Sequence, residues 1–193
     1  PLEASYDVLV SSGIHPHHAR RFFRRVTANP NEAVAREYKR INPHQVEVKP
    51  NGDWSIIFPQ QVDEDAITIK EQSASDFIKT VFHLFKYWIQ PGTNRDSLSH
   101  NVSATVTLRE GESVLEEIWA NRNSLAALSF APYTIDTIFP FSPRQAVETA
   151  KDEALWNDLI DNYNPVDWLL FKEEGDGTRH SQEPACVSGV CDI

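Results

Sequence analysis

Residues 101–108, Asn-Val-Ser-Ala-Thr-Val-Thr-Leu, decide the fold class of this chain. Apolar side chains alternate with polar, mostly hydroxyl-bearing ones along this stretch, which predicts a strand with one buried face. A helical pattern follows at 113–122, and the apolar run at 125–130 predicts a second strand, buried on both faces. Strand, helix and strand in this order predict an α/β fold.

The clearest helical pattern lies at residues 73–90, with Ser73 or Ser75 as its cap and Pro91-Gly92 as its end. Its predicted apolar face consists of Phe77, Val81, Leu84, Phe85 and Trp88. The other predicted elements are a loop over 1–19, a strand or helix over 20–27, a helix over 31–40 capped by Asn31, a loop over 42–51, a buried strand over 54–58 ended by Pro59, a loop over 131–140 and a long helix from Ser142-Pro143 to about Tyr163. Four tryptophans are expected in or near the core: Trp88, Trp119, Trp156 and Trp168.

Composition and charge exclude some classes of function. The chain has 193 residues and a formal net charge of -10, which argues against non-specific binding to nucleic acid. There is neither an apolar run of the roughly 18 to 20 residues that span a bilayer nor an apolar leader. We therefore expect a cytoplasmic protein without a membrane partner. The first residue is Pro1 and there is no Met, so we expect a fragment of a longer product.

Two clusters near the start of the chain allow two interpretations each. Arg20, Arg21, Arg24 and Arg25 flank two phenylalanines and could hold phosphate groups, because Arg makes bidentate contacts. The alternative is a strand that buries its phenylalanines and exposes its arginines. His15, His17 and His18 could bind a metal ion, but a loop with hydrogen-bonded or exposed histidines explains them better.

The two cysteines, Cys186 and Cys191, lie near the end of the chain. From Glu173 onward the sequence is polar, with glycines and a proline, so we predict a body over 1–172 and a flexible tail over 173–193. Two thiols four residues apart on such a tail could exchange with disulfides elsewhere. The alternatives are two incidental cysteines, or a metal-binding tail that also uses His180.

Four blocks of the sequence resemble the adenosylcobalamin-dependent (class II) ribonucleotide reductases, in the order in which that family has them. Residues 11–26, Ser-Ser-Gly-Ile-His-Pro-His-His-Ala-Arg-Arg-Phe-Phe-Arg-Arg-Val, resemble the segment after the family's substrate-phosphate loop. Residues 100–107 resemble a later barrel strand, and Ser-Phe-Ala-Pro-Tyr at 129–133 with Pro140-Phe141 resembles the next strand and loop. The terminal Cys-x4-Cys resembles the family's redox tail.

The resemblance implies the C-terminal portion of a ten-stranded α/β barrel and a part in the reduction of ribonucleotides to deoxyribonucleotides for DNA synthesis. It implies adenosylcobalamin as the cofactor, a ribonucleotide as the substrate, and the N-terminal remainder of the reductase, in the same chain or as a split subunit, as a partner. It implies that Cys186 and Cys191 re-reduce the active-site disulfide and are reset by thioredoxin or a similar dithiol donor.

Two departures from the family pattern limit this interpretation. The family's finger-loop Cys and barrel Cys pair have no counterpart, so the fragment alone is expected to be inactive. Residues 1–10 contain no glycine where the family's phosphate loop has one, which hinders close backbone approach to a phosphate. The alternative function is therefore a non-catalytic α/β module that binds a protein partner, or a degenerate reductase fragment.

Overall fold

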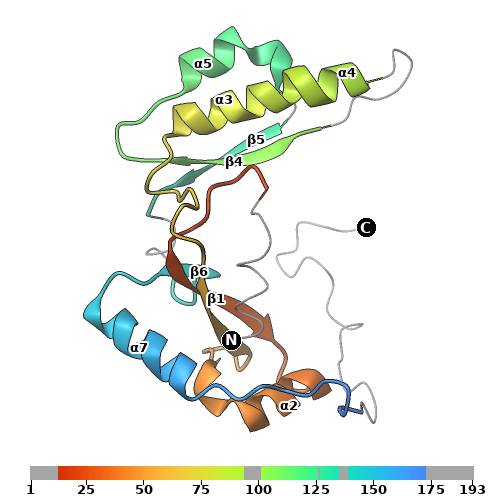
Figure 1. Cartoon of the computed structure of the whole chain (residues 1–193), viewed down its shortest axis with the longest axis vertical. Helices are drawn as coiled ribbons and strands as arrows, with labels where there is room; N and C mark the ends of the chain where they lie inside the picture. The colour runs from red at the N-terminus through yellow and green to blue at the C-terminus, as the bar shows by residue number, and fades with distance from the viewer. Residues whose placement is uncertain (1–12, 94–100, 126, 135–138, 173–193) are drawn as a thin grey trace.

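The computed structural model describes residues 13–93, 101–125, 127–134 and 139–172. These residues form an elongated molecule in which two units are stacked along the longest axis (Figure 1). One contains a four-stranded antiparallel sheet and is called the antiparallel unit. The other contains two parallel strands and is called the parallel unit. No described helix is long and apolar enough to cross a membrane.

The antiparallel unit has the strand order β2-β3-β1-β6. Its strands are β1 (Arg21–Ala28), β2 (Val46–Val48), β3 (Trp54–Gln61) and β6 (Arg144–Ala146), and its helices are α2 (Ala33–Ile41), the short η1 (Pro43–Gln45) and α7 (Ala150–Asp161). β1 pairs with β3 over its whole length, from Arg21↔Gln61 to Ala28↔Trp54.

Opposite faces of this sheet pack against different helices. Phe23 and Ile57 lie on one face and pack against Trp156 and Leu159 of α7. The next residues along each strand face the other way, and there Ile56 packs in a cluster with Ala28, Ala35 and Tyr38 of β1 and α2. Because a helix covers each face, this unit closes its own core.

The parallel unit is built on β4 (Ser103–Leu108) and β5 (Ala127–Pro132), paired from Ser103↔Ala127 to Leu108↔Pro132. The connection between them contains α5 (Leu115–Ala120) and the short η3 (Arg122–Ser124). Before β4, α3 (Ala74–Leu84) continues through the π-helical turn η2 (Phe85–Ile89) into α4 (Gln90–Gly92). The helices cover one face of the strand pair, with a core of Ala74, Phe77, Ile78, Val81, Ala104, Val106 and Val114.

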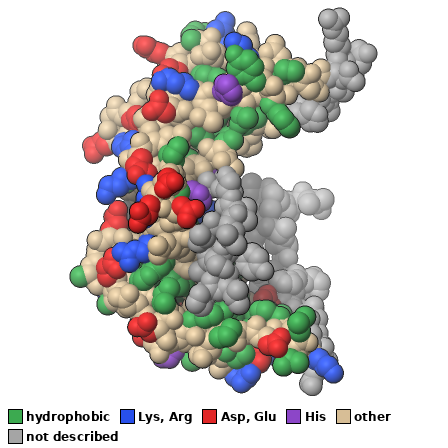
Figure 2. Space-filling model, viewed as in Figure 1, with side chains coloured by type: hydrophobic (Ala, Val, Ile, Leu, Met, Phe, Trp, Pro, Cys, Tyr) green, Lys and Arg blue, Asp and Glu red, His purple; other side chains and the backbone are tan. Residues whose placement is uncertain are grey.

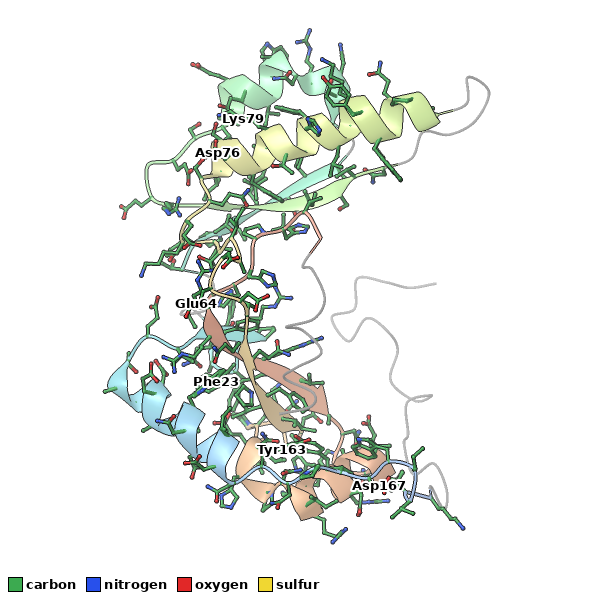
Figure 3. The ribbon with its side chains drawn as sticks, in the orientation of Figure 1. Phe23, Glu64, Asp76, Lys79, Tyr163 and Asp167 are labelled. Atoms are coloured by element: carbon green, nitrogen blue, oxygen red, sulfur yellow. The ribbon has the colours of Figure 1, made fainter. Side chains whose placement is uncertain are left out.

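Several predicted elements are confirmed. The fold is mixed α/β, the ambiguous stretch at 20–27 is the strand β1, and α2, α3, β4 and α5 lie where the patterns place them. The predicted cap of α2 is wrong, because its N-cap residue is Glu32 rather than Asn31 and makes no side-chain capping bond. The side chain of Ser73 caps α3 by accepting a hydrogen bond from the amide of Asp76. Figure 3 shows Asp76 and Lys79 on this helix. The described strands form two open sheets and no closed barrel.

Two predictions upstream of α3 are wrong. The stretch at 42–51 is not a loop, because it contains η1 and β2. Pro59 does not end its strand, since β3 runs on to Gln61. β2 pairs with β3 only as far as Ile56, so at Pro59 no ladder on that side needs the amide hydrogen that proline lacks.

The region of β5 and β6 also departs from the predictions. β5 is mostly exposed rather than buried, and Phe130 keeps 48% of its surface accessible. The long helix predicted from Ser142 is wrong. The amide of Arg25 donates to the carbonyl of Pro143 at 2.8 Å, which holds this segment against the sheet edge as β6. The helix α7 begins only at Ala150, after a capping box between Thr149 and Asp152.

The tryptophans divide between core and surface. Trp156 is buried at 6% exposure, as predicted, and Trp168 is 39% exposed. Trp88 and Trp119 are 75% and 71% exposed, so their predicted place in the core is wrong. At Trp88 the π-helical turn shifts the helical register and brings Ile89 into the buried position instead.

Candidate functional site

Two segments that are distant in sequence meet where the two units join. The amide of His17 donates to the carbonyl of Ile67, and the amide of Ile69 donates to the carbonyl of His17, both at 2.8 Å. These bonds form a parallel bridge between His17 and Thr68. The histidine-containing segment is therefore fixed by its backbone at the junction.

The three histidines of this segment have different neighbours. His15 Nε2 accepts a hydrogen bond from the amide of Thr105 at 3.2 Å, and its ring lies 5.2 Å from that of Phe77. His18 meets the ring of Phe22 edge-on, with 5.8 Å between centroids. In the part of the chain that the structure describes, no three His, Cys, Asp or Glu side chains gather as a metal site requires.

His15 is one of the electrostatically perturbed residues of the junction. Burial lowers its pKa, and the nearby positive charge of Arg144 lowers the pKa further. A neutral imidazole is consistent with its contact, because only an unprotonated nitrogen can accept the hydrogen bond from Thr105. Two of the blocks that carry the sequence resemblance thus touch each other across the junction.

Two adjoining hollows lie at the junction, with volumes of about 610 and 450 Å³, and we call them the junction groove. Both are lined by His18, Ile69 and Tyr133. The smaller one also receives Thr105 and Thr107 from the uncovered face of β4. On that face the hydroxyl of Thr105 lies 2.7 Å from that of Ser129 on β5. The groove therefore presents hydroxyl groups and imidazoles, which suits a polar ligand.

Arg109 of the parallel unit stabilises the segment at residues 69–70, which lines the junction groove. Its guanidinium donates to the carbonyls of Ile69 and Lys70, each at 2.9 Å, and lies 5.4 Å from the ring centroid of Tyr133. Glu112 accepts hydrogen bonds from the amides of Ala74 and Arg109 at 2.8 and 3.0 Å. Burial would raise the pKa of Glu112, but these amides and the charge of Arg109 hold that pKa below its ordinary value.

The arginine cluster divides into separate roles. Arg20 pairs with Glu71 at 2.8 Å, and Arg21 pairs with Glu153 of α7. The phenylalanines between the arginines are buried, Phe22 at 4% and Phe23 at 0% exposure, as the structural alternative predicted. Figure 2 shows acidic and basic side chains interspersed on the visible face near the junction. Arg24 lies opposite Arg144 on β6, a neighbour that the predicted helix from Ser142 had hidden.

Several predicted site residues lie outside the described residues. These are the tail cysteines Cys186 and Cys191, His180, and the stretch at 1–10 that takes the place of a phosphate loop. The shuttle role of the cysteines therefore stays a prediction. Sequence reasoning missed Arg109 and Arg144, because their roles depend on contacts with segments far away in the chain.

The described residues do not form a cobalamin site. The larger hollows measure about 450 to 730 Å³, which is the size range of drug-sized ligands. A corrinoid with its nucleotide and adenosyl groups is larger than such ligands. Adenosylcobalamin therefore rests on the resemblance alone.

Comparison with known proteins gives one structural relationship. No protein-family model and no curated protein matches the chain. A crystal structure of a B12-dependent (class II) ribonucleotide reductase superposes on 78% of the chain with a TM-score of 0.56 and 16% sequence identity. The chain spans about a fifth of that reductase, since the match covers 20% of its length. At this identity, the likeness shows that the chain shares the fold of a portion of a class II ribonucleotide reductase.

Proposed function

We propose that this chain is the C-terminal segment of a B12-dependent ribonucleotide reductase and that its tail supplies electrons for ribonucleotide reduction. The observation that carries the proposal is the structural likeness over 78% of the chain. It is supported by the contact of His15 with Thr105, which joins two of the blocks that resemble the family.

In this role Cys186 and Cys191 form a dithiol that attacks the active-site disulfide. A thiolate of the pair forms a mixed disulfide, and the second thiolate releases it. The active-site cysteines gain two electrons and two protons, and the tail cysteines lose the same number and become a disulfide. Thioredoxin or a similar dithiol donor then reduces the tail.

The polar composition of residues 173–193 suits this transfer. A flexible tether of about 20 residues has a root-mean-square reach of roughly 25 Å, which is of the order of a domain radius. Tethering gives the dithiol a high effective concentration at a disulfide that a separate protein cannot reach. Ribonucleotide substrate and the N-terminal remainder of the reductase are the partners that this role requires.

The test places Cys186→Ser and Cys191→Ser separately in the complete reductase and measures turnover with two reductants. Turnover with thioredoxin should be lost, whereas turnover with dithiothreitol should survive in part, because the small dithiol enters the barrel directly. Ser188→Ala, between the two cysteines, is the matched control and should retain both activities. Equal loss with both reductants in the cysteine variants would refute the shuttle role.

A protein-binding module without catalytic function is the second candidate. The observation that favours it is a set of large apolar side chains exposed on the helices of the parallel unit: Tyr87 at 60%, Trp88 at 75%, Leu115 at 71% and Trp119 at 71%. Large exposed apolar patches mark interaction surfaces. A pulldown with the full chain decides between the candidates, because the reductase role requires capture of the reductase's N-terminal part.

A further inference from the structure

The segment at residues 13–19, which we call the histidine segment, is joined to β4 by a bond that depends on protonation. His15 Nε2 accepts a hydrogen bond from the amide of Thr105 at 3.2 Å, across 90 residues of sequence. The acceptor is an imidazole nitrogen, so this bond exists only while that nitrogen carries no proton. The contact between the segment and β4 is therefore sensitive to pH.

A second connection at the same junction does not respond to pH. The guanidinium of Arg109 donates to the carbonyls of Ile69 and Lys70, each at 2.9 Å. A guanidinium stays protonated in proteins and a backbone carbonyl does not titrate, so these bonds persist in mild acid. The histidine segment is in turn held to residues 67–69 by the backbone bonds of His17. The junction thus combines a permanent connection at Arg109 with a conditional one at His15.

The surroundings of His15 favour its neutral form. Its ring lies 5.2 Å from that of Phe77 of α3, which does not titrate. β4 contributes hydroxyl groups to the smaller hollow of the junction groove, and residue 69 of the connecting segment is apolar. The titratable or charged side chains that line this hollow together with His15 are those of His18, Tyr133 and Arg144. Burial lowers the pKa of His15, and the positive charge of Arg144 lowers that pKa further.

We propose that the contact between His15 and Thr105 is a pH switch, closed while the imidazole is neutral and open once it is protonated. On protonation Nε2 becomes a donor that faces the amide hydrogen of Thr105, so the hydrogen bond is replaced by repulsion between two donors. The imidazolium is also repelled by the positive charge of Arg144.

Opening of the switch changes the junction groove without separating the two units. His15 and Thr105 both line the smaller hollow, so that hollow loses one of its fixed walls when the histidine segment leaves β4. The bonds of Arg109 to the connecting segment remain, and they keep the units together. This inference rests on the described residues and does not depend on the redox role of the tail.

The direction of the pH effect follows from the lowered pKa of His15. In the unfolded chain the imidazole titrates near its ordinary value of 6.5. Between this value and the lower folded-state pKa, the unfolded chain binds more protons than the folded one. The contribution of the contact to stability is therefore complete above the ordinary value and is lost as the pH falls from there through the folded-state pKa.

The test is a nuclear magnetic resonance titration of the full chain from about pH 7.5 to about pH 4.5, a range that brackets the ordinary pKa of histidine. The ring signals of His15 should titrate with a midpoint below 6.5. Protection of the Thr105 amide from hydrogen exchange, corrected for the intrinsic effect of pH, should fall about three- to tenfold over the same midpoint, as expected for the loss of one hydrogen bond. The amides of His17 and Ile69, which donate to carbonyls, should keep their protection.

Four variants assign the response to His15. His15→Gln retains an acceptor that does not titrate, so protection of Thr105 should no longer change with pH. His15→Phe keeps a ring against Phe77 but has no acceptor, so this protection should be low throughout. His44→Gln removes an exposed histidine of η1 and should keep the parental response. Arg144→Gln removes the neighbouring charge and should move the midpoint up toward 6.5.

The parent titration can overturn the proposal without any variant. A His15 ring that does not titrate in this range would do so, as would protection of Thr105 that stays constant while the ring titrates. A parental pH response in His15→Gln would likewise overturn the proposal, because it would assign the loss of protection to another group.

Discussion

The two units of this molecule show two ways to use a small sheet. In the antiparallel unit, helices on both faces bury Phe23 and Ile57 on one side and Ile56 on the other. In the parallel unit, helices cover one face of β4 and β5, and the other carries exposed hydroxyl side chains such as those of Thr105 and Ser129. Parallel strands are ordinarily covered on both faces. The antiparallel unit thus supplies its own core, whereas the parallel unit leaves an open polar face beside the junction groove.

The largest expected effect comes from the core of the antiparallel unit. Phe23→Ala removes a ring that is 0% exposed and packs against Trp156. We expect the free energy of unfolding to fall by about 3 to 5 kcal/mol. Urea denaturation followed by tryptophan fluorescence measures it. Val34→Ala, at a position 46% exposed, is the control. A similar loss of unfolding free energy in both variants would contradict a self-contained core in the antiparallel unit.

The next effect tests the brace between the units. Arg109→Ala removes the bonds to the carbonyls of Ile69 and Lys70, which tie the connecting segment to the parallel unit. We expect a loss of about 1 to 3 kcal/mol and faster hydrogen exchange at residues 67–72. Arg122→Ala, which loses one carbonyl contact within its own helical segment, should change neither quantity appreciably. Unchanged exchange in Arg109→Ala would show that the junction is held without this brace.

A smaller effect compares the carboxylates at the start of the main helix in each unit. Burial would raise the pKa of Glu112, beside α3, but hydrogen bonds and a neighbouring positive charge lower this pKa by more. Burial would also raise the pKa of Asp152 in α7, and there hydrogen bonds lower it by more. Both pKa values therefore lie below their ordinary values. Each carboxylate therefore adds stability that is complete above the unfolded-state pKa and is lost as the pH falls through the lower, folded-state pKa. Glu112→Gln and Asp152→Asn should cost about 0.5 to 2 kcal/mol at neutral pH.

The pH dependence separates this effect from a general weakening of the helices. Stability of the parent should decline as the pH falls below the ordinary values of 4.5 for Glu112 and 3.8 for Asp152. The decline should be shallower in each variant. Denaturation curves measured between neutral pH and about pH 3 test this. A slope unchanged in both variants would contradict the assignment of the two pKa shifts.

The smallest expected effect on stability is at the surface of the parallel unit. Trp119→Ala removes a side chain that is 71% exposed, so the free energy of unfolding should change by no more than about 0.5 kcal/mol. Trp156→Ala, at 6% exposure, is the buried counterpart and should cost about 3 to 5 kcal/mol. A large loss in Trp119→Ala would mean that this side chain is covered in the protein in solution.

Elements that form through local interactions were predicted correctly from the sequence, whereas an element that forms through contacts with a distant segment was not. The alternation at 101–108 and the periodicity at 73–90 are local, and they predicted β4 and α3. β6 could not be predicted, because it forms through pairing with β1, more than a hundred residues earlier. For the same reason the sequence did not predict that Arg144 lies opposite Arg24, since the two residues become neighbours only when β6 pairs with β1.

The candidate site shows the same division. The sequence pointed to the histidine segment, to the arginine cluster and to hydroxyl side chains at the positions that became the open face of β4. It could not show that Arg20 and Arg21 form ion pairs with acidic residues, nor that Arg144 comes to lie opposite Arg24 on the neighbouring strand. Nor could it show that Arg109 holds the junction through backbone carbonyls of another segment.

The sequence alone determined the α/β class, the strand with one hydroxyl face and the resemblance to class II ribonucleotide reductases. Only the tertiary structure decided that the strands form two separate open sheets, that Trp88 and Trp119 lie on the surface, and that Arg24 and Arg144 face one another. The physical reason is that side-chain periodicity reports burial within one element. Strand order, register and charge partners instead depend on free energies shared between segments far apart in the chain.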